Sequence, residues 1–151
     1  MKHLISQHLN IKSSMQHHIF LYILTVLFLI FGIVQFNDPD PWLWIGIYFG
    51  VSLISILANI KYKPNSKING SIRILTLSFL IGLFVYASML IPEIVSWINN
   101  GMPNIAKTMK TEEPHIEYTR EFFGLILSIF SLFYCQKKLR EIHWFLVLPC
   151  L

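Results

Sequence analysis

The chain has 151 residues, of which 54 % are hydrophobic and 13 % are charged, whereas a typical soluble domain is roughly 25 % charged. This is the length of one domain, and its two cysteines lack the spacing of a disulfide framework or a zinc site. The net charge of +4 is explained by where Lys and Arg lie in the predicted membrane topology, so nucleic-acid binding is not expected.

Three long apolar runs without charged residues indicate membrane-spanning helices. They cover residues 19–36, 42–60 and 74–91. A helix of 18 or 19 residues, at about 1.5 Å per residue, nearly crosses a hydrocarbon core of about 30 Å. A cleaved signal peptide fits the first run poorly, because the run is too long and no small-residue cleavage site follows it. We therefore predict that the first run is a permanent helix.

The fourth span reaches full length only by including charged residues. Residues 122–135 are apolar but too few to cross the hydrocarbon core. Starting the helix at Glu117 gives 19 residues and draws Arg120 and Glu121 towards the edge of the hydrocarbon. Charges at that depth are costly and tend to face the interior of a bundle, where they pair. The start of this span therefore predicts a site.

The predicted fold is all-α, an integral membrane four-helix bundle. Its spans are expected at about 18–36, 41–60, 73–97 and 115–136, after an N-terminal tail of residues 1–17 and before a cytoplasmic or interfacial tail of residues 137–151. Nine Lys and Arg residues fall on the side of both termini and three on the other side, which predicts that both termini are cytoplasmic. Seven of the eight carboxylates fall on the outer side. A bacterial inner membrane is the expected location.

A very short acidic turn, Asn-Asp-Pro-Asp-Pro at residues 37–41, connects the first two spans. Its prolines and Asn-Asp pair favour a tight reversal, and Asp40 before Pro41 is typical of the start of a helix. Two interpretations stay open: a purely structural turn, or a rigid pair of carboxylates that binds a cation or a buried Arg. Trp42 and Trp44 just after the turn suit an aromatic belt at the outer interface.

The third connection is expected to begin with a helix break. Pro92 should kink or end the third helix, so that residues 93–98 form a short outer extension and residues 99–110 form a loop.

Charged residues at the start of the fourth span share one helical face. Glu113, Glu117 and Glu121 are spaced at i, i+4 and i+8. Two pairings are open for Arg120: an ion pair with Glu117, three residues earlier, or a contact across the bundle with a carboxylate of the acidic turn, which suits the two-point geometry of an Arg side chain.

The same outer carboxylates make a weak metal site at most. Asp38, Asp40 and Glu117 offer hard oxygen ligands, but their spacing matches no standard zinc or EF-hand pattern, and Arg120 would repel a cation. We predict no metal and no cofactor.

Three glycines are placed to allow helices to approach closely. Gly46 and Gly50 lie four residues apart in the second span, and Gly124 lies four residues after Arg120. Packing within the protein's own bundle is the expected use of the Gly46–Gly50 pair, with a homodimer seam as the alternative.

Two strings resemble those of the transmembrane protein 220 family. One is Gln-Phe-Asn-Asp-Pro-Asp-Pro-Trp at residues 35–42, before a second span that contains Tyr48; the other is Glu117-x-x-Arg120-Glu121-x-x-Gly124-Leu125. The resemblance runs from about residue 20 to residue 135 and implies a small four-helix membrane protein of unassigned activity. With Glu93 from the same outer side, the candidate site consists of Asn37, Asp38, Pro39, Asp40, Glu93, Glu117, Arg120 and Glu121.

No motif marks a nucleophile or a general base, so no catalytic residue is predicted and the chain is not expected to be an enzyme. The expected function is that of an accessory or scaffold subunit that packs against another membrane protein within the lipid bilayer, with its oligomeric state left open. The alternative is binding or transport of a cation or a polar headgroup at the outer acidic cluster.

Overall fold

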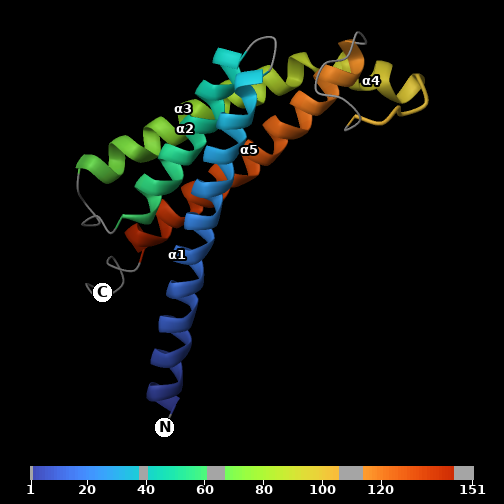
Figure 1. Cartoon of the computed structure of the whole chain (residues 1–151). Coiled ribbons are helices and arrows are strands. Elements are labelled where there is room, and N and C mark those ends of the chain that lie inside the picture. The colour runs from blue at the N-terminus through green and yellow to red at the C-terminus, as the bar shows by residue number, and fades with distance from the viewer. Residues whose placement is uncertain (1, 38–40, 61–66, 106–113, 145–151) are drawn as a thin grey trace.

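The computed structural model describes residues 2–37, 41–60, 67–105 and 114–144. Each secondary-structure element in these ranges is helical (Figure 1). In chain order the elements are α1 (Lys2–Val34), the short 3-10 helix η1 (Gln35–Asn37), α2 (Pro41–Asn59), α3 (Lys67–Met89), α4 (Ile91–Asn99) and α5 (Pro114–Trp144).

Four stretches of the described chain are long and apolar enough to cross a membrane. They are Met15–Val34, Pro41–Asn59, Lys67–Asn99 and Pro114–Arg140. The predicted all-α fold with four spans is therefore confirmed, and the protein is a multi-pass membrane protein.

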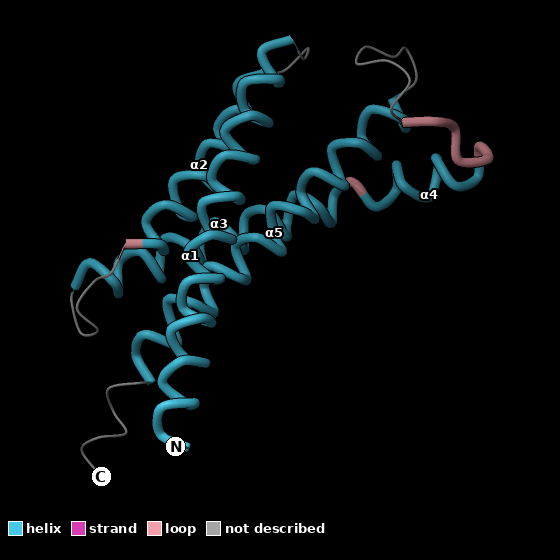
Figure 2. The backbone as a smooth tube through the Cα atoms, turned by 60° about the horizontal axis from the view of Figure 1, so that its bottom comes forward, coloured by secondary structure: helices cyan, strands magenta, loops and turns pink. Residues whose placement is uncertain are grey.

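The four long helices form two packed pairs. α1 lies along α2, and α3 lies along α5, while α2 and α5 pack against each other and so join the pairs (Figures 1 and 2). α1 and α3 therefore flank a central layer of α2 and α5. We call the end of the bundle that holds the start of α3 and the last turns of α5 the basic end, after its residues Lys67, Arg73, Lys137, Lys138 and Arg140. The opposite end, with η1, α4 and the start of α5, is the acidic end.

Each central helix buries one stripe of residues with alternating spacings of three and four. On α2 the stripe comprises Trp44, Tyr48, Val51, Ser55 and Ala58. On α5 it comprises Glu121, Leu125, Ser128, Leu132, Cys135 and Leu139. This is the spacing of knobs-into-holes packing, and it fixes which face of each helix points into the bundle.

Buried hydroxyl groups in the spans are satisfied by backbone carbonyls. Those of Thr25, Thr76 and Ser128 each donate to the carbonyl four residues earlier, at 2.7–2.9 Å. Ser52 on α2 instead donates to the carbonyl of Thr25 on α1, at 3.1 Å. In hydrocarbon no water is present to replace such partners, so each of these hydroxyls is paired within the protein.

α1 continues well beyond the bundle at the basic end. It is one helix from Lys2 onwards, so residues 2–17, predicted as a tail, are continuous with the first span. Figure 1 shows this N-terminal part projecting away from the other helices. α5 likewise runs to Trp144, past the expected end of the span at residue 136.

The helix break predicted at Pro92 falls just before that residue. α3 ends at Met89, and Pro92 occupies the first turn of α4, where its missing N–H group has no intrahelical partner to lose. α4 then covers residues 91–99 in place of the expected 93–98. The chain reverses after it through Gly101 and Met102, which have φ angles of 81° and 54°.

Candidate functional site

A hydrogen bond between buried side chains joins α2 to α5 near the acidic end. The indole Nε1 of Trp44 donates to Oε1 of Glu121 at 3.0 Å. Glu121 is 8 % exposed and Trp44 is 1 % exposed. Glu121 faces inwards because it begins the buried stripe of α5, in register with Leu125 one turn later. The carboxylate thus lies inside the bundle and is held there by a donor from a neighbouring span.

Aromatic rings from three helices surround this contact. The ring of Tyr48 lies 5.8 Å from that of Trp44, and Tyr86 of α3 lies 6.0 Å from it. Phe28 and Phe31 of α1 lie 5.9 Å and 5.7 Å from Tyr48. Such separations suit favourable ring pairing. Together with the carboxylate from α5, the cluster therefore draws on all four spans at one level.

Gly124 makes room for this cluster. A Cβ atom at Gly124 would collide with the hydroxyl of Tyr48. Gly50 is similar, since an added Cβ would lie 2.7 Å from the ring of Phe79 on α3. Gly46 differs, because nothing lies within 4 Å of its added Cβ. Gly50 and Gly124 thus allow close packing inside the chain's own bundle, while Gly46 faces open space.

The acidic turn of the predicted site lies outside the described residues. This applies to Asp38, Pro39 and Asp40, while Asn37 is the last residue of η1. The contact of Arg120 with a carboxylate of that turn therefore stays a prediction.

The remaining residues of the predicted site lie on α4 and α5. Glu117 and Arg120 are half-buried at the start of α5, and Glu93 is half-buried in the first turn of α4. α4 is held against α5 by Trp97, whose ring lies 6.5 Å from that of Phe123 and whose Nε1 donates to the carbonyl of Pro103 at 3.0 Å. Among the described residues, no three His, Cys, Asp or Glu side chains are grouped so as to hold a metal ion.

The sequence-based placement of Trp44 is wrong. Trp42 is 79 % exposed, as an interfacial residue would be, but Trp44 points into the bundle. The spacing that carries this information was present in the sequence: Trp44, Tyr48 and Val51 follow the same three-and-four register as Glu121 and Leu125. The contact between the two stripes could not be predicted from the sequence, because no local pattern shows which two stripes face each other in the fold.

Residues 27–137 match the sequence profile described as "Transmembrane family 220, helix". A search of curated proteins and a search of solved structures each found no match. The matched region contains the aromatic cluster, Gly124 and the buried carboxylate, and it covers most of the length of the chain. The chain therefore belongs to transmembrane family 220.

Proposed function

We propose that the protein is an accessory or scaffold subunit that binds a larger membrane protein through the outer face of α1. The observation that carries this proposal is a shallow hollow of about 390 Å³ on that face. Its lining residues are Tyr22, Ile23, Val26, Leu27 and Ile30. An apolar helix of a partner fits such a surface, since van der Waals packing drives helix association within lipid.

The position of α1 supports this role. α1 packs mainly on α2 at the flank of the bundle, and the buried share of its span is 28 %, the same as for the span Lys67–Asn99 and less than the 44 % of α2. Its N-terminal part also projects past the basic end (Figure 1). A partner could therefore contact both the span and the projecting part of the same helix.

The contacts of the polar groups inside the bundle also support a structural role. The carboxylate of Glu121 is engaged by Trp44, and the hydroxyls of Thr76 and Ser128 are engaged by their own helices. The first contact ties α2 to α5, as a scaffold requires, and the hydroxyl bonds leave no donor of Thr76 or Ser128 unpaired in the bundle.

Photo-crosslinking in native membranes tests the proposal. A photoreactive phenylalanine derivative at Ile23 or Ile30 should give one discrete adduct with a different protein. The same substitution at Ile81 or Phe84 is the matched control, because these residues of α3 are as exposed, at 58 % and 62 %, as Ile23 and Ile30, at 56 % and 52 %.

Two results would contradict the accessory role. One is an absence of adducts from α1, or the same adducts from α3 as from α1. The other is an adduct of twice the chain mass of 17.7 kDa, which would identify a second copy of the chain as the neighbour of α1.

A further inference from the structure

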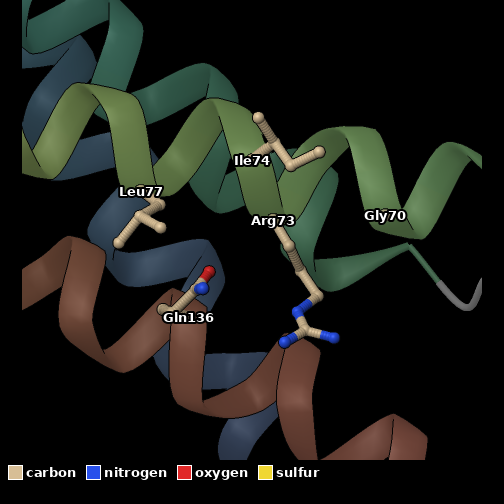
Figure 3. Close-up of a pocket in the computed structure, with 5 residues that line it drawn as sticks. All are labelled: Gly70, Arg73, Ile74, Leu77 and Gln136. Carbon is tan, nitrogen blue, oxygen red and sulfur yellow. The ribbon is translucent and has the colours of Figure 1, made fainter.

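A cavity of about 300 Å³ opens between α3 and α5 at the basic end (Figure 3). Gly70, Arg73, Ile74 and Leu77 line it from α3, and Gln136 lines it from α5. Figure 3 shows the side chain of Arg73 extending from α3 towards α5, and that of Gln136 extending from α5 towards α3.

Two of the residues that line this cavity each have a buried polar side-chain atom. Nε of Arg73 and Oε1 of Gln136 are both buried, and neither has a hydrogen-bond partner among the described residues. A buried polar group left in this state lowers the stability of the fold. Both atoms have almost no accessible surface in this structure, so each side chain has to turn towards the cavity before a ligand can offer an acceptor to Arg73 and a donor to Gln136.

A phosphodiester headgroup has this combination of groups. Its phosphate oxygens are the preferred partners of an Arg guanidinium. The alcohol esterified to the phosphate carries a donor, a hydroxyl in glycerol headgroups or an ammonium in ethanolamine headgroups. That donor suits the carbonyl oxygen of the Gln136 amide.

The surroundings of the cavity fit a lipid better than a free anion. Arg73 is the seventh residue of α3, so it lies about 9 Å along the helix axis from its start, at the level where basic residues meet headgroups. Further along α3, Ile74 and Leu77 are 68 % and 50 % exposed, which offers apolar surface to an acyl chain. Nothing lies within 4 Å of a Cβ added at Gly70, so the mouth of the cavity is open.

We propose that this cavity binds a phospholipid headgroup, with the phosphate on Arg73 and the hydroxyl or ammonium group on Gln136. Phosphate is the chemistry that a lipid and a free anion would share, and the apolar surface of α3 assigns the site to the lipid. The inference does not depend on the proposed accessory role, which concerns the opposite flank of the bundle.

Native mass spectrometry of the full chain in detergent tests the assignment. Titration with phosphatidylglycerol should show one tightly bound lipid on the wild type and about tenfold weaker binding on Arg73→Gln, the loss expected for a charged hydrogen bond. Lys67→Gln is the matched control, because it removes the same charge from an exposed residue of the same helix outside the cavity. Its binding should match the wild type, and thermal unfolding should show that each variant is folded.

Gln136→Leu examines the second contact. The wild type should prefer phosphatidylglycerol and phosphatidylethanolamine to phosphatidylcholine, whose headgroup has no hydrogen-bond donor, and the variant should lose this preference. Equal losses in Arg73→Gln and Lys67→Gln would overturn the proposal, since binding would then follow net charge alone. Displacement of the lipid by millimolar inorganic phosphate would also overturn it, in favour of a free-anion site.

Discussion

Trp44 and Glu121 are 77 residues apart in the chain, yet their side chains meet inside the bundle at 3.0 Å. The contact links α2 to α5, the two helices through which the pair of α1 and α2 packs against the pair of α3 and α5. Because both side chains are buried, the bond lies in surroundings of low dielectric, where hydrogen bonds are strong and their loss is costly. This pair therefore helps to hold the two packed helix pairs together.

Trp44→Phe should lower the free energy of unfolding by about 1–2 kcal/mol, because it keeps an aromatic ring but removes a donor to a buried carboxylate. Chemical denaturation in detergent micelles measures the change. Trp42→Phe is the matched control, since Trp42 lies on the same helix and is 79 % exposed. An equal loss in both variants would show that the indole N–H of Trp44 contributes nothing specific.

Glu121→Leu should lower stability, and Glu121→Gln should lower it less, because an amide oxygen still accepts from the indole. Combining Glu121→Leu with Trp44→Phe should cost little more than the worse single change, as expected for two groups that act through one contact. The same denaturation assay measures these four variants and the wild type. Additive losses would mean that the two side chains stabilise the bundle independently.

Gly124→Ala should be destabilising by about 1–3 kcal/mol, because the new methyl group collides with the hydroxyl of Tyr48 and forces it to move. Its cost should shrink when Tyr48→Phe is also present. Gly82→Ala is the control, since nothing lies within 4 Å of its added Cβ, and replacing Gly with Ala inside a helix otherwise stabilises it. A loss of stability in Gly82→Ala as large as in Gly124→Ala would remove the argument from crowding.

Arg120→Ala should destabilise the protein if Arg120 pairs with a carboxylate, and double-mutant cycles identify the partner. Coupling to Asp38→Ala or Asp40→Ala would support a contact across the bundle, whereas coupling to Glu117→Ala would support a pair within α5. We expect the former, with the double variant little worse than either single variant. Thermal unfolding in detergent provides the measurement, and additive effects for all three carboxylates would show that Arg120 pairs with none of them.

The spans could be read from the sequence because each depends on local properties. An uncharged run of sufficient length has few alternatives to a membrane helix, and Pro92 marked the break between α3 and α4 to within a few residues. The residue at which the first helix begins was harder to predict. Residues 2–17 are polar enough to be a surface helix or a disordered tail, and their continuity with the first span depends on helix propagation through residues 15–18 rather than on hydropathy.

The candidate site was only partly predictable, for a different reason. Glu121 was singled out by its charge at the edge of a span, which is a local signal. Trp44 was assigned to the interface because Trp residues near a span end usually lie there, and its neighbour Trp42 is exposed, as that placement requires. What separates the two is rotation about the helix axis: Trp44 shares the inward face of Tyr48 and Val51, and Trp42 does not.

The continuity of α1 has a mechanical consequence. At about 1.5 Å per residue, its 33 residues make a rod of about 50 Å, so the part beyond the bundle is aligned with the transmembrane part in both direction and rotation. A molecule bound to residues 2–14 would thereby be held at a fixed rotation about the helix axis relative to the bundle. One alanine inserted after Ser14 would turn that outer segment by about 100° while leaving the spans unchanged. The length of α1 thus sets the rotation of its outer segment about the helix axis relative to the transmembrane part.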